Sequence, residues 1–279
     1  MTMAGNAGMT SGSETFKRHT FQTSDGVALS FLETGAQHAG TQKPTIALVP
    51  GWSMPAVIWH NQLEALGQKF HVAALDPRGQ GESSVPTSGY TAERRATDLR
   101  EFLQAFSKVV LIGWSLGAIE ALQYVHMFGD EQISGLVLVD SSVGEEPAPP
   151  ADETFFQRLR KDRDKTLDEF VRAVFRGPRA EEAIDRLVQG AKRMALEDSL
   201  ALLSYPFVRT HWRRIAHAFE RPLLYVVTPQ FAEQARNLKK NRPATQVEIF
   251  TDAGHALFVD EPDRFNALIA TFVAGLAGR

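Results

Sequence analysis

The sequence contains no cysteine among its 279 residues. Disulfide bonds, thiolate metal sites and a cysteine nucleophile are therefore excluded. No apolar run reaches the length of about eighteen residues that a membrane-spanning helix needs. Histidine and acidic residues show no metal-ligand spacing, and no glycine-rich phosphate loop occurs in the chain. We therefore expect no metal, no cofactor and no membrane partner.

An excess of charge of one sign is also missing. The chain has 30 Lys and Arg against 33 Asp and Glu, a net charge of -3, and a pI of about 6.3. This balance does not favour nucleic acid as a partner. We expect a small-molecule partner and a monomer or homodimer. Residues 1–14 lack the basic and apolar regions of a signal peptide, so we interpret them as a disordered leader and predict a cytoplasmic protein.

A strand-turn-helix pattern stands in the middle of the chain. Residues 109–114 are mostly apolar and β-branched, and they run into Gly-Trp-Ser-Leu-Gly at 113–117, which an amphipathic helical pattern follows. A bare Gly-x-Ser-x-Gly occurs by chance in many proteins, but between a strand and a helix it indicates a displayed nucleophile. The two glycines fit a turn too tight for side chains. We therefore predict that Ser115 is a nucleophile.

Other apolar runs of strand length alternate with helical patterns along most of the chain. The strand-like runs lie at 16–22, 27–33, 45–49, 71–75, 135–139, 222–227 and 246–250. This alternation predicts an α/β fold: a mostly parallel, twisted sheet with helices on both faces. Functional sites in such sheets lie outside the carboxyl ends of the strands. Pro50, Asp76, Ser115 and Asp140 all fall at that edge.

The pattern changes at Glu-Glu-Pro-Ala-Pro-Pro, residues 145–150. From there to residue 219 the apolar spacing is helical and no strand-like run interrupts it. One interpretation is that these are crossover helices of the core. We favour a helical cap over the sheet edge, spanning 145–219. The α/β core then comprises 15–144 and 220–279.

A nucleophilic serine needs a base within hydrogen-bond reach, and the base needs an orienting acid. The chain has eight histidines. His255 alone is expected in a loop directly after a buried strand, preceded by glycine and at the carboxyl edge of the sheet. We predict that His255 is the base and that the others are solvated or packed.

Three motifs together resemble the α/β-hydrolase family: residues 113–117, Asp-Pro-Arg-Gly-Gln-Gly-Glu-Ser at 76–83, and Ala-Gly-His at 253–255. The resemblance runs from about residue 16 to the end. It is greatest to small carboxylesterases, both the arylesterase and cofactor-free haloperoxidase branch and the pimeloyl-carrier-protein methyl ester esterases. It implies Ser115 as nucleophile, His255 as base, and an oxyanion hole made by the backbone N–H groups of Trp52 and Leu116.

The chain departs from the family pattern in two places. Pro50 stands where the family usually has histidine, although the implied oxyanion donor is Trp52, so the hole can survive. The loop after strand 222–227 lacks the usual carboxylate, and Glu233 is the nearest candidate there. Some members of the fold carry the acid after the next strand beyond the nucleophile, where Asp140 stands. We predict Asp140, with Glu233, no working acid, and a purely structural Asp140 as alternatives.

These residues predict hydrolysis of a carboxylic ester through an acyl-enzyme. Trp52, Met54 and Trp114 lie near the nucleophile, and a pocket lined by them suits an apolar acyl or aromatic group. Other chemistries on the same site stay open, namely an acyltransferase, perhydrolase, lactonase or carbon–carbon hydrolase. A hydroxynitrile-lyase-like activity and a non-catalytic ligand-binding protein are further alternatives.

Overall fold

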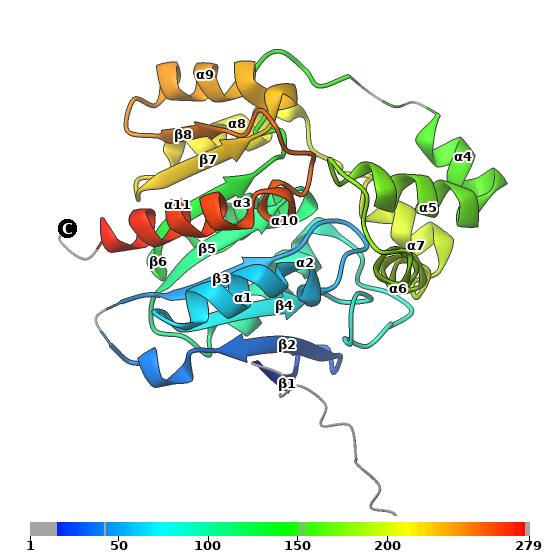
Figure 1. The fold of residues 1–279 in the computed structure, drawn as a ribbon, viewed down its shortest axis with the longest axis horizontal. Coiled ribbons are helices and arrows are strands. Elements are labelled where there is room, and N and C mark those ends of the chain that lie inside the picture. The colour runs from blue at the N-terminus through cyan, green and yellow to red at the C-terminus, as the bar shows by residue number, and fades with distance from the viewer. Residues whose placement is uncertain (1–15, 42, 151, 153, 277–279) are drawn as a thin grey trace, which may run out of the picture.

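The computed structural model describes residues 16–41, 43–150, 152 and 154–276. An eight-stranded sheet forms its centre, in the order β1-β2-β4-β3-β5-β6-β7-β8 (Figure 1). β1 and β2 run antiparallel to their neighbours, and all other pairs are parallel. The strands are β1 (Lys17–Gln22), β2 (Ala28–Thr34), β3 (Thr45–Val49), β4 (Val72–Asp76), β5 (Val109–Trp114), β6 (Ile133–Val139), β7 (Leu223–Val227) and β8 (Gln246–Ile249).

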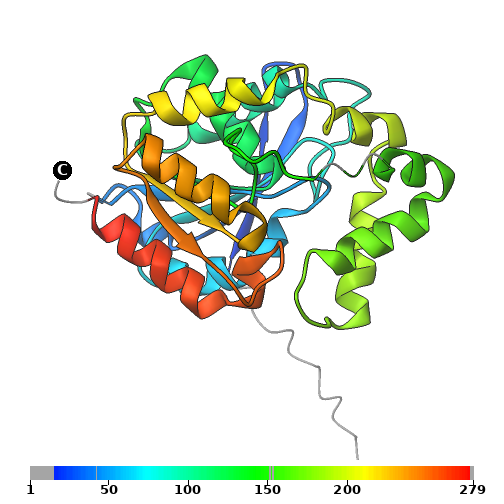
Figure 2. The ribbon, with the colours of Figure 1, turned by 90° about the horizontal axis from the view of Figure 1, so that it is seen from above.

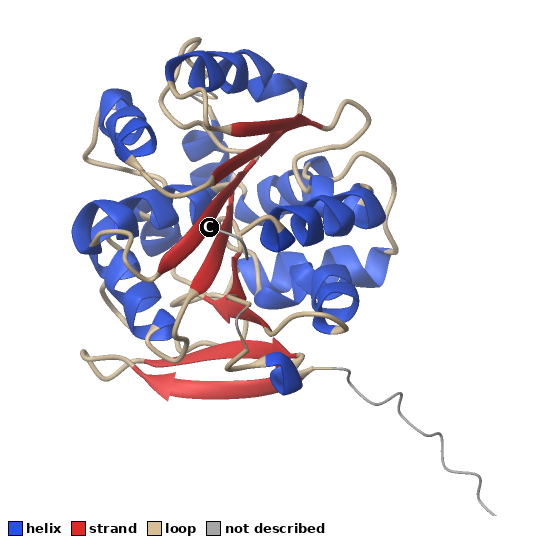
Figure 3. Ribbon diagram, turned by 90° about the vertical axis from the view of Figure 1, so that its left-hand side faces the viewer, coloured by secondary structure: helices blue, strands red, loops and turns tan. Residues whose placement is uncertain are grey.

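Helices cover both faces of the twisted sheet (Figure 3). One face carries η2 (Ala56–Trp59), α1 (His60–Gly67), α10 (Leu257–Asp260) and α11 (Pro262–Ala274). The other carries α2 (Ala92–Leu103), α3 (Leu116–Phe128), α8 (Arg209–Ala218) and α9 (Ala232–Asn241). Short 3-10 turns, η1 (Ala36–His38) and η3 (Pro229–Phe231), lie in connections. The fold expected from the sequence is confirmed.

The central strands are mostly apolar because both of their faces are covered. Along β3, Ile46 and Leu48 pack into the core on the α1 and α11 side. Ala47 and Val49, which alternate with them, pack into the core on the α2 and α3 side. Alternate side chains of a strand point to opposite faces, so each strand contributes to two cores.

Element boundaries follow the sequence with one notable difference. The apolar spacing predicts a single helix over 57–70, but the chain first makes the 3-10 turn η2 and then the shorter helix α1. The amide of Ala56 at the start of η2 donates to the carboxylate of Asp76 (2.6 Å), the last residue of β4, which fixes where this turn begins. Thr91 caps α2, because its Oγ1 accepts from the amide of Arg94 (3.2 Å).

Four helices lie to one side of the sheet as a separate layer (Figures 1 and 2). They are α4 (Phe155–Lys161), α5 (Arg163–Ala173), α6 (Glu181–Ala191) and α7 (Leu196–Ala201). We call these helices, together with the segments that connect them, the α4–α7 unit. The fifth helix of the strandless region, α8, instead packs on α3 and buries Trp212 and Ile215 in the sheet core. The core and cap boundaries stay a prediction, but α8 belongs with the core by its packing.

Two further expectations concern the leader and membrane-spanning helices. The leader predicted for residues 1–14 lies outside them. Within the part of the chain that the structure describes, no helix is both long enough and apolar enough to cross a membrane.

Candidate active site

Ser115 occupies the sharp turn between β5 and α3. Its backbone has φ 55° and ψ −118°, a conformation that costs energy for any residue but glycine. A Cβ on Gly117 would lie 2.5 Å from the carbonyl oxygen of Val49, and one on Gly113 would overlap the carbonyl of Gly117. The two glycines are therefore required by close approach of backbone, as expected. The turn leaves Ser115 partly exposed at the carboxyl edge of the sheet.

His255 and Asp140, from the loops after β8 and β6, meet at the same edge. The imidazole Nδ1 of His255 lies 2.7 Å from Oδ2 of Asp140. A carboxylate only accepts hydrogen bonds, so Nδ1 carries the proton and Nε2 is left as an acceptor. Asp140 is 1% exposed. Its other oxygen, Oδ1, accepts from both the amide (2.6 Å) and the hydroxyl (2.8 Å) of Thr228.

Thr228 was not identified from the sequence. It directly follows β7, in the loop where the family resemblance leads one to look for the acid. That loop supplies two donors to Asp140 instead of a carboxylate. The signal in the sequence was only indirect: a polar residue at the end of a buried strand next to the strand that ends in Asp140.

Trp114 joins the nucleophile turn to the histidine loop. Its indole Nε1 donates to the backbone carbonyl of His255 (2.9 Å), and the two rings lie 5.1 Å apart. Trp114 immediately precedes Ser115, so this bond holds the base beside the strand end that carries the serine. Trp114 is buried and acts here through its ring and its N–H.

The loop after β3 lies against the nucleophile. A Cβ on Gly51 would sit 3.1 Å from Cβ of Ser115. Gln80 supports this loop from inside: its amide nitrogen donates to the carbonyls of Gly51 (3.1 Å) and Met54 (2.8 Å), and its oxygen accepts from the amide of Ser53 (3.3 Å). Gln80 was not identified from the sequence either. Its three hydrogen bonds hold the loop after β3 in place.

The three side chains predicted to line a pocket are all buried. Met54 is enclosed in the core, and Trp52 reaches into the α4–α7 unit, where its indole N–H donates to the carbonyl of Ser199 in α7 (2.7 Å). The Trp52 ring also meets Phe155 and Phe170 edge-on. Their role as substrate contacts stays a prediction. Trp52 in addition joins the loop after β3 to this helical layer.

Glu233 lies away from this arrangement. It stands in the first turn of α9 with a side chain that is 56% exposed, and it pairs with Arg236 (2.8 Å). Since Nδ1 of His255 is already bound to Asp140, the geometry favours Asp140 as the orienting acid.

The two implied oxyanion donors lie in the segments that follow neighbouring strands. Leu116 is the first residue of α3, and Trp52 lies in the loop after β3. The first amides of a helix lack partners within it and face outward.

Asp76 serves the scaffold at this edge. Its carboxylate accepts from the amides of Ala56 (2.6 Å) and Glu82 (3.1 Å) and from the guanidinium of Arg18 (2.7 Å). Burial raises the pKa of Asp76 above its ordinary value, and these donors offset the rise only in part. The loops that follow β3 and β4 are thereby tied to one another.

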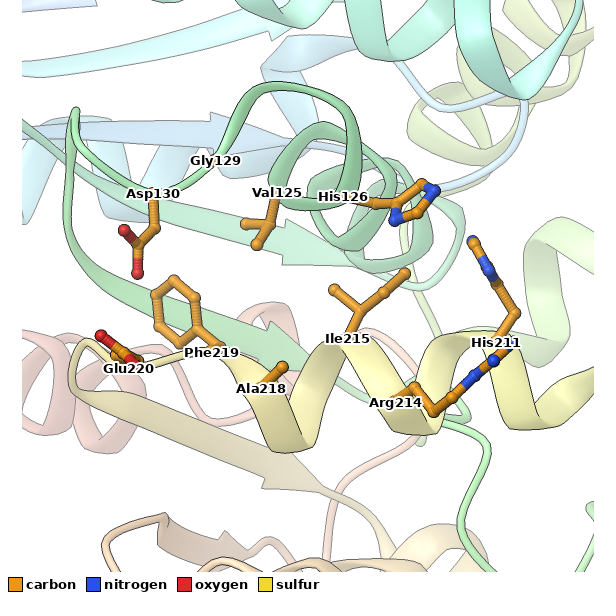
Figure 4. A pocket seen from close by; sticks show the side chains of 10 residues that line it. All are labelled: Val125, His126, Gly129, Asp130, His211, Arg214, Ile215, Ala218, Phe219 and Glu220. Atoms are coloured by element: carbon orange, nitrogen blue, oxygen red, sulfur yellow. The ribbon is translucent and has the colours of Figure 1, made fainter.

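Two hollows lie near these elements. A cavity of about 910 Å³ separates η2 from α6, and its apolar lining includes Ile58, Phe175, Ile184 and Leu187. A groove of about 550 Å³ lies between α3 and α8, with His126 and His211 at one end and Asp130 and Glu220 at the other (Figure 4). None of the predicted site residues lines either hollow. Among the described residues, no group of three or more His, Asp or Glu could hold a metal ion.

Comparison with known proteins identifies the family of this chain. The pattern of the alpha/beta hydrolase family matches residues 46–268, well over half of the chain. The chain belongs to the α/β-hydrolase family. A similar curated protein is the pimeloyl-[acyl-carrier protein] methyl ester esterase of Vibrio atlanticus, 27% identical over 84% of this chain and 96% of that protein.

Solved structures show the same fold. An esterase from Exiguobacterium antarcticum matches with a TM-score of 0.78 and 20% identity, over 91% of this chain and 98% of that one. A bromoperoxidase from Bacillus anthracis matches with a TM-score of 0.80 and 21% identity, over 92% of this chain and all of the other. At such identities the likeness concerns the fold. The curated esterases among the relatives make ester hydrolysis the supported class of activity for this α/β-hydrolase.

Proposed function

We propose that this α/β-hydrolase is a serine carboxylesterase that works through an acyl-enzyme. The observation that carries the proposal is the 2.7 Å hydrogen bond between His255 and Asp140, held beside the strained turn of Ser115. A serine hydroxyl is a weak nucleophile at neutral pH, and a correctly oriented imidazole is what activates it.

The groups divide the steps of the proposed reaction between them. The Ser115 oxygen attacks the ester carbonyl while Nε2 of His255 takes its proton. Asp140 keeps the proton of His255 on Nδ1 and stabilises the imidazolium that forms. The backbone N–H groups of Leu116 and Trp52 stabilise the oxyanion. His255 then protonates the leaving alcohol, and water, activated by His255, releases the acid from Ser115.

We further propose that the substrate carries an apolar acyl or aromatic group. Support comes from the cavity of about 910 Å³ beside η2, whose lining is largely apolar and which falls within the usual size of small-molecule sites, although neither Ser115 nor His255 lines it. One wall, Val259, lies four positions after His255, and another, Ile58, follows the loop that contains Trp52. The α4–α7 unit, which supplies the opposite wall, would act as the cap.

Hydrolysis of p-nitrophenyl esters of increasing chain length tests the proposal. We expect turnover by the wild type, an optimum that reports pocket length, and a loss of about 10⁶-fold in kcat for Ser115→Ala. A fluorophosphonate should label the wild type at Ser115 and leave Ser115→Ala unlabelled. Absence of both turnover and labelling would overturn the esterase assignment. Labelling with acyl transfer to added alcohol in preference to water would make the protein an acyltransferase.

A further inference from the structure

The loop that carries His255 is held by the α4–α7 unit as well as by the sheet. The amide of Ala256, directly after His255, donates to the carbonyl of Val174 at the end of α5 (2.7 Å). The amide of Gly254, directly before it, donates to Oδ2 of Asp260 (2.8 Å). Both backbone neighbours of the base are therefore fixed, and one of them is fixed directly by the α4–α7 unit.

Asp260 is bound to that unit as well. Its Oδ2 also accepts from the amide of Arg176 (2.9 Å), and its Oδ1 pairs with the guanidinium of Arg179. Both residues belong to the connection between α5 and α6, residues 174–180. The Asp260 side chain is 6% exposed, and Arg179 is 31% exposed. One buried carboxylate thus joins the histidine loop to the α5–α6 connection through three donors.

The histidine loop and the α5–α6 connection are also in close steric contact. A Cβ on Gly254 would lie 2.7 Å from the amide nitrogen of Arg176 and 2.8 Å from the carbonyl carbon of Phe175. The histidine loop and the α5–α6 connection therefore touch backbone to backbone. Such a contact leaves no room for one segment to slide past the other while the hydrogen bonds persist.

We infer that Asp260 is a positioning residue for the esterase reaction, because it locks the loop of His255 to the α5–α6 connection. The inference rests on the proposed function. Asp140 sets the tautomer of the ring and Trp114 holds its backbone carbonyl, whereas Asp260 sets where the loop sits relative to the α4–α7 unit. The bond to the carbonyl of Val174 and the cross-link through Asp260 together tie the position of the loop to that of the unit.

The test compares Asp260→Ala, Asp260→Asn and Arg179→Gln with the wild type. Misplacing a catalytic group by about 1 Å costs about 100-fold in rate. We expect a fall of about that size in kcat on p-nitrophenyl acetate for Asp260→Ala, and about tenfold for Arg179→Gln, with KM nearly unchanged. Asp260→Asn keeps one acceptor oxygen and should recover part of the loss. The matched control is Glu181→Gln, which breaks an exposed ion pair with Arg172 inside the α4–α7 unit and touches nothing of the histidine loop.

Two readouts separate positioning from mere folding. Rates are divided by the concentration of Ser115 that the fluorophosphonate titrates, so that unfolded protein does not lower the measured kcat. The low-field proton resonance of the His255–Asp140 hydrogen bond is recorded by NMR without any substrate. We expect this signal to broaden or shift in Asp260→Ala and Arg179→Gln and to stay in Glu181→Gln.

The possible failures are distinct. A wild type that hydrolyses no ester overturns the proposed function. A wild type that turns over, with Asp260 and Arg179 variants that keep kcat per titrated serine and the low-field signal, overturns the positioning role. If Asp260→Ala does not fold, Asp260→Asn and Arg179→Gln decide the question by the same measurements.

Discussion

Replacing Asp140 by asparagine tests the proposed acid most sharply, because the surroundings dictate how the new side chain must turn. The oxygen that faces Thr228 receives two hydrogen bonds, from the amide (2.6 Å) and the hydroxyl (2.8 Å). An asparagine NH₂ turned toward Thr228 would set donor against donor and leave buried groups unsatisfied, at about 1–3 kcal/mol each. The carboxamide oxygen therefore stays with Thr228, and the NH₂ group faces His255.

This orientation reverses the tautomer of the base. An NH₂ donor opposite Nδ1 of His255 requires Nδ1 to accept, which puts the ring proton on Nε2. The nitrogen that should take the proton of Ser115 is then already protonated. The comparable change in serine proteases lowers kcat by about 10⁴-fold, which corresponds to about 5 kcal/mol in the activation free energy. KM should change little, because no substrate contact is altered.

The assay is steady-state hydrolysis of p-nitrophenyl acetate, with the rate of Ser115→Ala subtracted as background. Glu233→Gln serves as control and should match the wild type, since Glu233 is exposed and paired with Arg236. Thr228→Val should lose about tenfold or less, because the amide of residue 228 and His255 still bind Asp140. Retention of more than a tenth of kcat by Asp140→Asn would refute the reasoning, and a large loss in Glu233→Gln would point to the other carboxylate.

Three further predictions concern the scaffold. Gly117→Ala should prevent stable folding, as judged by circular dichroism, because its Cβ would lie 2.5 Å from the carbonyl of Val49. Arg95→Met should lower the free energy of unfolding in urea by about 3–5 kcal/mol, since Glu120, only 4% exposed, would lose the partner 2.8 Å away; adding Glu120→Leu should restore much of it. Burial raises the pKa of Asp76, so its protonated form stabilises the fold and this contribution is lost as pH rises through the native pKa. The stability of wild type relative to Asp76→Asn should therefore fall as pH rises above the ordinary pKa of an aspartate, and a rise would contradict the assignment.

Local sequence was enough to predict the elements whose environment is uniform. Apart from Thr45, the runs at 45–49 and 135–139 contain no polar side chain because both faces of those strands are covered, and few environments besides a doubly covered sheet favour such short runs. The end of the helical insertion was harder to predict. α8 shows the same helical spacing of apolar residues as the helices of the α4–α7 unit, and spacing reveals a buried face without revealing what covers it. Only the packing of Trp212 and Ile215 into the sheet core assigns α8 to the core.

The residues of the candidate site likewise differ in how well the sequence could predict them. Ser115 and His255 sit in short motifs with a local structural meaning, so sequence alone could single them out. Asp140 was reached only through resemblance to the family, because a strand-end aspartate has many ordinary uses. Thr228, 88 positions from Asp140, and Gln80, 29 from Gly51, act across long sequence separations. No pattern along the chain records which loops meet at the sheet edge, so these supports became visible only in the folded structure.

Backbone strain gives one more argument that this edge is the functional one. Among the described residues, three that are not glycine have positive φ: Ser53 at 59°, Ser115 at 55° and Asp140 at 43°. They lie in the turn after β3, directly after β5 and directly after β6, all at the carboxyl edge. Each such conformation costs about 1–3 kcal/mol and persists only where the surroundings over-determine it. Gln80 binds the amide of Ser53, the carbonyl of Val139 accepts from the amide of Ser115, and Thr228 binds the side chain of Asp140. The fold thus holds strained backbone at the three points where the proposed reaction needs an oxyanion loop, a nucleophile and an acid.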